Sequence, residues 1–546
     1  MFNFAHFDNE LLPVLNLIPD IVKQQITENE YKIIKPFALK MLTFVDDLGH
    51  KIPHTIIADF VQLLFKFLRN DISAIDWNKI KEIKNEEIVN ANNLDSFQDL
   101  GQANLNKLVV LKLNGGLGTT MGLRSAKSSI IVDLKRKKTF LHLIKEQLDE
   151  LNLEFNCKIP LWFLNSFHTK RDTEKILSHD SYFELLQNEF PRIKVENNES
   201  YVPFEYQECP TSEWYPPGHG DLYRVFKNKK FLEQMIADGK EYLFVSNADN
   251  LGATVDLGII GYVISNKVDF LMEVSKKTVL DKKGGILVNY NDKLSLVEAV
   301  QVSAKYQTDF ENINKFSYFN TNSLWFNIKK LLEIINHGFE LPILINKKKI
   351  QENQLIQLET AMGAIISYFP NAQILDVPKS RFLPVKTNRE LLLLRSDLIK
   401  KEKKFVVNKE RARNNLIPEI VLSPNYCCLD KFENYLQNVP SLINVDLLSL
   451  NGEVFFSGKT PAILQGKIVL ESIDKPLEIS DMVSLTDISI KVQETTVEIK
   501  SLNSKRPVTQ EKNGNQFILK GFDLQQKSWQ TKLLIFPDRV VLTNFD

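Results

Sequence analysis

Apolar residues recur at helical spacing over much of the first hundred residues. They return every three or four positions over Pro36–Leu48 and over Ile56–Leu68, and this spacing predicts two helices. Two prolines break Leu11–Gln24 into shorter pieces. This N-terminal helical segment, residues 1–100, holds no glycine-rich loop and only dispersed carboxylates. We therefore expect it to serve as a scaffold or cover.

The pattern changes over residues 101–395, where short apolar runs alternate with helical stretches. The runs are Leu108–Leu113, Ile159–Ser166, Tyr242–Asp249 and Val268–Ser275. Such alternation is typical of an α/β domain with a doubly wound, mainly parallel sheet. Sites in these sheets form at the carboxyl ends of strands, and polar residues close three of the runs: Asn114, Asn165 and Asp249.

The last part of the chain has a third pattern. Residues 396–443 are charged and mixed, and we expect a linker there. Over residues 444–546, short apolar pieces are broken by turns at spacings too short for helices. The spacing favours stacked short strands, as in a β-solenoid, although a small β-sandwich stays open because the repeat is irregular.

Composition excludes several classes of protein. The chain has 546 residues, 43% hydrophobic and 25% charged, which fits a folded protein of two to four domains. Lys plus Arg and Asp plus Glu both total 68, so no global field attracts nucleic acid or acidic lipid. We interpret the basic runs Lys135–Lys138, Lys347–Lys349 and Lys400–Arg413 as solvated surface.

The cysteines and the hydropathy of the chain indicate the cellular compartment in which we expect the protein. Cys157, Cys209, Cys427 and Cys428 lack metal-site spacing and are expected to be buried free thiols. The first residues show no basic segment followed by an apolar one, and no uncharged apolar stretch reaches 18 residues. We expect a cytoplasmic protein with no membrane partner.

A glycine-rich stretch follows the first apolar run of the central region. It places Gly115, Gly116, Gly118 and Gly122 ahead of Lys127. Glycines let backbone N–H groups approach an anion, and we expect the N-terminus of a following helix to add positive charge. The stretch fits neither the dinucleotide pattern, whose third glycine arrives one residue late, nor the Walker pattern. A plain structural turn stays open, but the lysine favours a triphosphate.

Two further stretches indicate chemistry. Asp249 ends a predicted strand, where a carboxylate suits Mg²⁺, although an Asx turn is the simpler alternative. His219 lies in a turn fixed by Pro216, Pro217 and two glycines, so its ring is held in place. We interpret this histidine as a binding group, not a general base. No convincing Ser/His/Asp or Cys/His set occurs.

LNGGLGTTMG followed by Lys127 resembles the signature of the UTP–glucose-1-phosphate uridylyltransferase family. Further blocks are similar to that family's blocks, in its order: Asn188–Ile193, Glu213–Tyr223, Ser246–Asp256, Phe319–Asn327, Gln357–Ile366 and Arg381–Leu394. The sequence departs from the common pattern at Arg124–Ala126, before the lysine, and at Ser323.

The resemblance implies a fold and an activity. It implies a Rossmann-like nucleotidyltransferase domain and a C-terminal left-handed parallel β-helix domain. It also implies uridylyl transfer from UTP to glucose 1-phosphate, by direct in-line attack of the sugar phosphate on the α-phosphorus. Mg²⁺ is the implied cofactor, and the β-helix is a possible site of homo-oligomer formation.

The resemblance also implies roles for single residues. Lys127 and Lys386 would neutralise the reacting phosphates and so act in catalysis. The nucleotide would be bound by Leu113, Asn114, Gly115, Gly116, Gln187, Gly218, Asn247 and Asp249. Gln187 would read uracil, and Asp249 would also hold the metal. The sugar phosphate would be bound by His219, Asn320, Asn322, Glu359 and Thr360.

Three other functions are weighed against this one. A uridylyltransferase for N-acetylhexosamine 1-phosphate, or one of broad specificity, is the alternative within the class. A nucleic-acid-binding protein is disfavoured by the zero net charge. A catalytically inactive relative is disfavoured because Lys127, Asp249 and Lys386 are all present.

Overall fold

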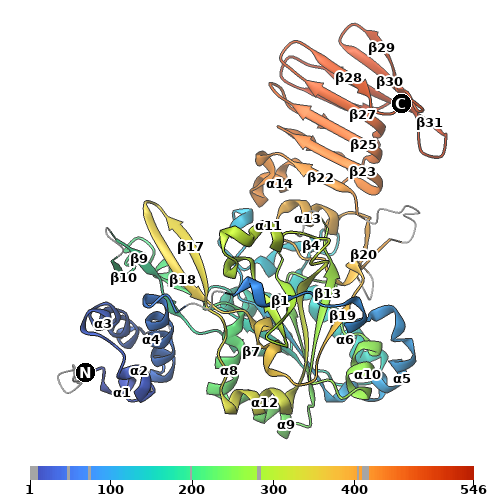
Figure 1. Cartoon of the computed structure of the whole chain (residues 1–546). Coiled ribbons are helices and arrows are strands. Elements are labelled where there is room, and N and C mark those ends of the chain that lie inside the picture. Colours follow the sequence, from blue (N-terminus) through green and yellow to red (C-terminus); the bar gives the residue numbers. More distant parts are fainter. Residues whose placement is uncertain are drawn as a thin grey trace.

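The computed structural model describes residues 10–45, 49–71, 75–196, 200–278, 284–401, 405–408 and 417–545. Figure 1 shows an N-terminal group of helices beside a central α/β unit, with a separate stack of strands above it at the C-terminal end. Much of the basic run Lys400–Arg413 lies outside the described residues. Within the described ranges, no helix combines the length and the hydrophobicity needed to cross a bilayer.

The N-terminal helices are α1 (Leu12–Leu15), α2 (Asp20–Lys23), α3 (Glu28–Thr43) and α4 (His54–Leu68). α4 matches its prediction closely, but α3 begins eight residues before the predicted Pro36, which lies inside it. The cause is a capping box in which Thr27 and Glu30 bond each other's backbone N–H groups. Phe37 and Phe60 pack in one core with Phe190 and Tyr215 of the central unit.

Residues 75–100 are less helical than expected. β1 (Ile80–Lys81) pairs with β14 (Ile286–Tyr290), which also pairs with β15 (Lys293–Val297). β2 (Ile88–Asn90) forms an edge of the large sheet. These strands are short, and each is ordered by a distant partner, so no local periodicity reveals them.

The central sheet has eight strands and confirms the predicted mainly parallel α/β fold. Their order is β2, β19 (Ala372–Asp376), β13 (Phe270–Lys276), β16 (Tyr318–Asn327), β12 (Tyr242–Asn247), β3 (Leu108–Asn114), β6 (Leu161–Asn165) and β7 (Phe183–Leu186). Only β16 runs antiparallel to its neighbours in this sheet. The carboxyl ends of β12, β3 and β6 therefore lie side by side.

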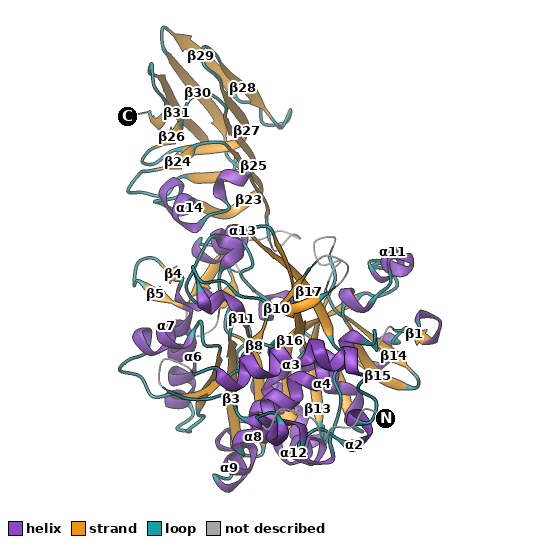
Figure 2. Ribbon diagram, turned by 90° about the vertical axis from the view of Figure 1, so that its left-hand side faces the viewer, coloured by secondary structure: helices purple, strands orange, loops and turns teal. Residues whose placement is uncertain are grey.

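Helices cover both faces of this sheet (Figure 2), which explains why its strands are apolar without alternation. On one face, Val110 shares a buried cluster with residues of α6 (Phe140–Glu154) and α10 (Leu257–Ser265). On the other, Val109 and Leu111 pack with residues of α8 (Leu222–Lys229) and α12 (Ile328–His337).

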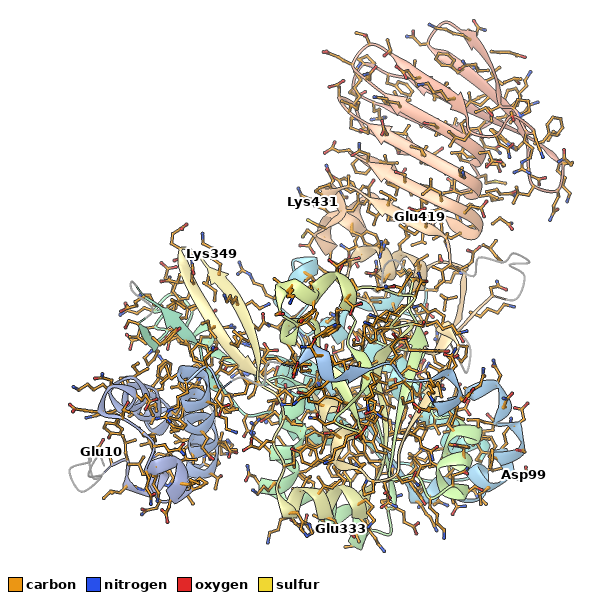
Figure 3. The ribbon with its side chains drawn as sticks, in the orientation of Figure 1. Glu10, Asp99, Glu333, Lys349, Glu419 and Lys431 are labelled. Atoms are coloured by element: carbon orange, nitrogen blue, oxygen red, sulfur yellow. The ribbon has the colours of Figure 1, made fainter. Side chains whose placement is uncertain are left out.

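A four-stranded sheet joins the N-terminal helices to the central unit. It consists of β10 (Tyr201–Pro203), β9 (Ile193–Val195), β18 (Asn353–Glu359) and β17 (Leu344–Ile350), with β8 (Phe190–Pro191) and β11 (Trp214–Tyr215) paired nearby. Lys349 projects from the end of the β17–β18 hairpin (Figure 3) and pairs with Glu352 at 3.1 Å. The basic run Lys347–Lys349 is exposed, as expected of a solvated surface.

The C-terminal strands form two sheets. β22 (Glu419–Leu422), β23 (Ser441–Asn451), β25 (Ile463–Ser472) and β27 (Ser484–Val492) pair in parallel. The second sheet also contains parallel pairs, formed by β24 (Val454–Phe456), β26 (Leu477–Ile479) and β32 (Val540–Asn544). β28 (Val497–Ser501), β29 (Thr509–Asn513), β30 (Gln516–Phe522) and β31 (Ser528–Ile535) pair antiparallel. The predicted stacking of short strands is therefore present, with an antiparallel end.

The other helices and strands complete the described chain. They are α5 (Gln98–Ala103), α7 (Lys170–Ile176), α9 (Phe231–Ala237), α11 (Gln307–Phe310), α13 (Asn388–Arg395), α14 (Leu429–Tyr435), β4 (Ile131–Asp133), β5 (Lys138–Thr139), β20 (Ile399–Lys401) and β21 (Phe405–Val407). The four cysteines are free thiols, but the prediction that they are buried is wrong: Cys427 is exposed, and Cys157, Cys209 and Cys428 are partly exposed.

Candidate active site

A cavity of about 290 Å³ opens at the carboxyl ends of β3, β6 and β12. Its wall contains most of the residues that the sequence singled out. The wall is formed by Leu113, Asn114, Gly115, Gly116, Lys127, Ser128, Leu164, Gln187, Pro216, Gly218, His219, Asn247, Ala248, Asp249 and Glu359. The predicted Asn320, Asn322, Thr360 and Lys386 do not belong to this wall.

The glycine-rich stretch leaves β3 and folds back on itself. Leu117 and Ala126 form an isolated bridge, and the Lys127 N–H donates to the Gly116 carbonyl at 3.2 Å. Gly122 has a φ of +75°, in the left-handed region that favours glycine. The expected helix after the loop is absent, because only a three-residue 3₁₀ turn, Lys127–Ser129, follows. Backbone N–H groups and Lys127 are therefore the positive elements here, without a helix N-terminus.

Lys127 and Asp249 form an ion pair inside the cavity. The lysine Nζ lies 2.9 Å from the Asp249 Oδ2, and both side chains are less than one-fifth exposed. Asp249 Oδ1 is buried and accepts no hydrogen bond from the described part of the chain. One carboxylate oxygen is thus occupied by the lysine and the other is available to a ligand.

Asn114 lines the cavity, and its side chain is bonded to other residues of the protein. Its buried side-chain Nδ2 donates to Asn165 Oδ1 at 2.8 Å and to Thr173 Oγ1 at 2.9 Å. These bonds tie the end of β3 to β6 and α7, and they leave the main chain of the loop to face the cavity.

Gln187 lies against the glycine loop in the cavity wall. It is buried, and its Nε2 donates to the Gly218 carbonyl at 3.0 Å. A Cβ on Gly115 would lie only 2.3 Å from Gln187 Oε1, so a side chain there would displace the amide. The glutamine and the glycine loop therefore fix each other's position.

His219 is held as a neutral ring. Its Nδ1 accepts a hydrogen bond from the Met362 N–H at 2.9 Å, so in the neutral ring the proton is on Nε2, 3.4 Å from the Asn322 amide nitrogen. Burial lowers the pKa of His219 to about 4. A neutral N–H donor suits the binding role expected of this residue and not that of a general base near neutral pH.

This pKa makes stability depend on pH. An unfolded histidine titrates near pH 6.5, so between about pH 6.5 and pH 4 the unfolded chain binds a proton that folded His219 does not. The free energy of unfolding should therefore fall on acidification through this window. In His219→Asn the fall should be smaller by about 2 kcal/mol, as measured by denaturant unfolding at pH 7 and pH 4.5.

His179→Asn is the control for that experiment, because His179 is exposed. The control should keep the steep pH dependence of the unsubstituted chain. Equal pH dependence in the chain with and without His219 would contradict the assignment.

Asn320, Asn322 and Thr360 lie just behind His219 and Gly218. The Asn320 Nδ2 donates to Asn322 Oδ1 at 2.9 Å, which fixes both amides on β16. Thr360 N–H donates to the Pro217 carbonyl at 3.0 Å, and its carbonyl accepts from Gly220 N–H at 2.8 Å. These contacts join the β16 and β18 blocks to the His219 turn, although the residues stay outside the cavity wall.

Lys386 is on a loop that runs along the Asp249 strand end. The preceding Val385 N–H donates to the Asp249 carbonyl at 3.3 Å, and the Lys386 carbonyl accepts from Thr120 Oγ1 at 3.0 Å. Burial raises the pKa of the Glu298 carboxyl, and the nearby Lys386 opposes that shift. The loop thus places Lys386 beside the cavity, next to a carboxylate.

Sequence reasoning missed Ser128 and Glu298. Ser128 lines the cavity, and its buried Oγ accepts or donates no hydrogen bond within the described residues. Its place after Lys127, as in the lysine-serine pair of Walker loops, was the available signal. Glu298 has no such signal, because only the fold brings it near Lys386.

Comparison with known proteins gives the family. The sequence model described as UTP–glucose-1-phosphate uridylyltransferase matches residues 57–461. A uridylyltransferase of this name from Solanum tuberosum is 39% identical over 423 residues, covering 75% of this chain and 87% of the relative. A protein named UTP–glucose-1-phosphate uridylyltransferase 2, from Dictyostelium discoideum, is 38% identical over 417 residues, covering 75% of this chain and 82% of the relative.

Solved structures agree with the sequence match. A Trypanosoma brucei protein described as UDP-glucose phosphorylase superposes with a TM-score of 0.73 at 32% identity, covering 85% of this chain and all of that one. A mutant UDP-glucose pyrophosphorylase from Leishmania major, in complex with UDP-glucose, superposes with a TM-score of 0.73 at 31% identity, covering 84% and 99%. The chain belongs to the UTP–glucose-1-phosphate uridylyltransferase family.

Proposed function

We propose that this protein transfers the uridylyl group of UTP to glucose 1-phosphate, giving UDP-glucose and pyrophosphate. The observation that carries the proposal is the cavity at the ends of β3, β6 and β12, which is lined by the glycine loop and by the ion pair that Lys127 of this loop forms with Asp249. The site holds the charges that a polyphosphate needs. The matching family and the similar proteins are named after the same reaction.

The chemistry is a direct in-line displacement. A phosphate oxygen of the sugar phosphate attacks the α-phosphorus, that bond forms as the bond to the β-phosphate oxygen breaks, and the electron pair leaves with pyrophosphate. Two anions must meet, so the protein must position them and neutralise their charge. Lys127 on the glycine loop and Lys386 on the loop bonded to Asp249 would supply the positive charge.

Asp249 is the residue that would hold Mg²⁺. This ion takes oxygen ligands and is commonly bound by one or two carboxylates together with substrate phosphates. Asp249 fits, because its Oδ1 is buried and unbonded within the described residues. Those residues contain no group of three or more candidate ligands, so phosphates and water would complete the shell. The ion would neutralise phosphate charge.

The remaining predicted residues divide between the two substrates. Leu113, Gly115 and Gly116 would contact the nucleotide through the backbone, with Asn247 at the end of β12. Gln187 and Gly218, joined by a hydrogen bond, would face uracil. His219 and Glu359 in the wall would face the sugar phosphate, with Asn320, Asn322 and Thr360 behind them.

A panel of sugar 1-phosphates with UTP and Mg²⁺ tests this proposal. Pyrophosphate release with glucose 1-phosphate should exceed that with N-acetylglucosamine or galactose 1-phosphate. Preference for the acetylated sugar, or equal rates with all three, would instead support the alternative of a different or broad specificity.

Gln187→Ala should weaken the choice between UTP and CTP. An amide pairs donor and acceptor with uracil's edge, and cytosine presents the reversed pattern there. The ratio of kcat/KM values for the two nucleotides should fall about tenfold. Gln354→Ala is the control, because Gln354 is exposed on β18; a ratio unchanged in both variants would contradict the uracil assignment.

We propose a left-handed parallel β-helix for the C-terminal strands. The parallel pairing of β22, β23, β25 and β27, with β24 and β26 in a second sheet, supports it. A homo-oligomer formed through this part, a cytoplasmic location and the absence of nucleic-acid binding stay predictions from the sequence. Light scattering coupled to gel filtration would measure the oligomeric state.

A further inference from the structure

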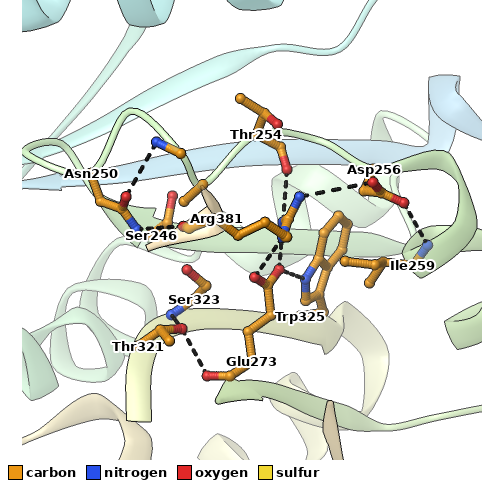
Figure 4. A network of polar contacts seen from close by, with 12 residues as sticks. Ser246, Asn250, Thr254, Asp256, Ile259, Glu273, Thr321, Ser323, Trp325 and Arg381 are labelled. Atoms are coloured by element: carbon orange, nitrogen blue, oxygen red, sulfur yellow. Dashed lines mark hydrogen bonds and ion pairs between the residues drawn. The ribbon is translucent and has the colours of Figure 1, made fainter. Parts of the chain in front are cut away.

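A buried ion pair lies beside the candidate site without forming part of its cavity wall. The Arg381 guanidinium donates from Nε to Glu273 Oε2 at 2.9 Å and from Nη2 to Oε1 at 2.7 Å. Trp325 Nε1 also donates to Oε1, at 2.9 Å (Figure 4). The Glu273 side chain is fully buried and that of Arg381 is one-tenth exposed. Removing two charges from water costs free energy, and the attraction between them need not exceed that cost. A contribution to stability is therefore a poor explanation for the presence of this ion pair.

The arginine holds the loop that follows β12. Its Nη2 donates to the Thr254 carbonyl at 3.0 Å, and Nη1 lies 3.9 Å from Asp256 Oδ2 (Figure 4). This loop begins at Ala248 and contains Asp249, so the ion pair fixes the chain that carries the carboxylate of the site.

Asn250 connects the same loop to the chain that carries Lys386. Its Nδ2 donates to the Arg381 carbonyl at 3.1 Å, and its Oδ1 accepts from Leu383 N–H at 2.8 Å. The asparagine is buried, and it also forms an isolated bridge with Pro384. Two residues beyond Pro384 is Lys386.

The backbones of the two loops also pack directly. A Cβ on Gly252 would lie 2.4 Å from the Ser380 carbonyl oxygen, so no side chain fits between them. On the other side, Lys112 of β3 donates from Nζ to Ser246 Oγ at 2.7 Å and to the Ala253 carbonyl at 2.6 Å. The loop that carries Asp249 is therefore held by hydrogen bonds from Arg381 and from Lys112.

We propose that Arg381, Glu273 and Asn250 are positioning residues that fix the backbone of Lys386 relative to Asp249. The inference rests on the proposed role of Lys386. A lysine side chain is long and flexible, so its contribution depends on where its backbone is held. A displacement of about 1 Å in a reacting geometry can lower the rate about 100-fold.

Glu273→Gln is the test. It keeps the size of the side chain and one oxygen acceptor, and it removes the charge that holds Arg381. We expect kcat to fall about tenfold or more. KM for UTP should stay within about threefold, because Gln187 and Gly218, the groups expected to bind uracil, lie on other elements.

Glu433→Gln is the matched control. Glu433 pairs with Arg395 at 2.6 Å, and the Arg395 side chain is only 1% exposed. Arg395 also donates to the Ile131 carbonyl, so its described contacts lie away from the Asp249 and Lys386 loops. The control also removes the negative charge of a carboxylate paired with a buried arginine, and its kcat should stay near that of the unsubstituted chain.

A double-variant cycle with Lys386→Ala separates positioning from general damage. If Glu273 acts through Lys386, Glu273→Gln should lower kcat less than about threefold further once the lysine is removed, because coupled sites are not additive. Two outcomes would overturn the proposal. In the first, Glu273→Gln lowers kcat by the same factor with and without Lys386→Ala; in the second, Glu273→Gln alone leaves kcat unchanged.

Asn250→Ala provides a second route if Glu273→Gln does not fold. It keeps the ion pair and removes the link to Arg381 and Leu383, and the same cycle and the same outcomes apply. If Lys386→Ala itself turns over normally, the proposed role of the lysine fails. If Lys386→Ala is impaired and the cycle is additive, only the positioning inference fails.

Discussion

Lys386→Ala is expected to lower kcat by about 10²- to 10³-fold, the loss typical of removing a charged group that acts on the transition state. Lys386 follows the segment bonded to Asp249 and Asn250, and we expect its side chain to reach the reacting phosphates from there. Its ammonium would reduce the repulsion between the two anionic substrates. Steady-state kinetics of UDP-glucose formation would measure the change.

The lysine is not part of a buried core, so the melting temperature should change by no more than about 2 °C. The control is Arg389→Ala, which should turn over normally. Arg389 lies three residues after Lys386, and its side chain is more than one-third exposed. Lys127→Ala should also lose turnover strongly. Near-normal kcat in either lysine variant would remove that lysine from the proposed mechanism.

Asp249→Asn should abolish the dependence of activity on Mg²⁺ together with most of the activity itself. The substitution keeps the size of the side chain but removes the negative charge that attracts the cation and that pairs with Lys127 at 2.9 Å. We expect kcat to fall at least about 10²-fold at saturating Mg²⁺. Activity titrated with Mg²⁺ measures both effects.

Glu241→Gln is the control for the loss of a carboxylate. Glu241 precedes β12 at its opposite end and pairs with Lys107 at 3.0 Å. Its variant should keep the Mg²⁺ titration of the unsubstituted chain. An Asp249→Asn variant with an unaltered titration would place the metal elsewhere.

The strands that build the site could be predicted because each is a local signal. Leu108–Leu113 and Tyr242–Asp249 are apolar runs that need burial on both faces, and each ends in polar residues where a parallel sheet opens. The sheet then places Leu113 beside Asn247, and Asn114 beside Asn165. The resemblance supplied the other site residues, which no pattern of burial would single out.

The features that could not be predicted from the sequence are those that depend on contacts between residues far apart in the chain. β2 is three residues long and takes its conformation from β19, almost 300 residues away. Arg381 and Glu273 are likewise separated by more than 100 residues, and neither stands out by spacing or composition. The start of α3 was missed for a different reason, since a proline normally ends a helix and here the capping box at Thr27 outweighs it.

Within the cavity wall, the charges of Lys127 and Asp249 balance each other. A divalent cation arriving alone meets a carboxylate already shared with a lysine, and a triphosphate arriving alone meets a lysine already shared with a carboxylate. A complex of the cation with the triphosphate can replace the Lys127–Asp249 ion pair by two others, in which the cation pairs with Asp249 and the triphosphate pairs with Lys127. Metal and nucleotide should therefore strengthen each other's binding by the same factor, as thermodynamic linkage requires.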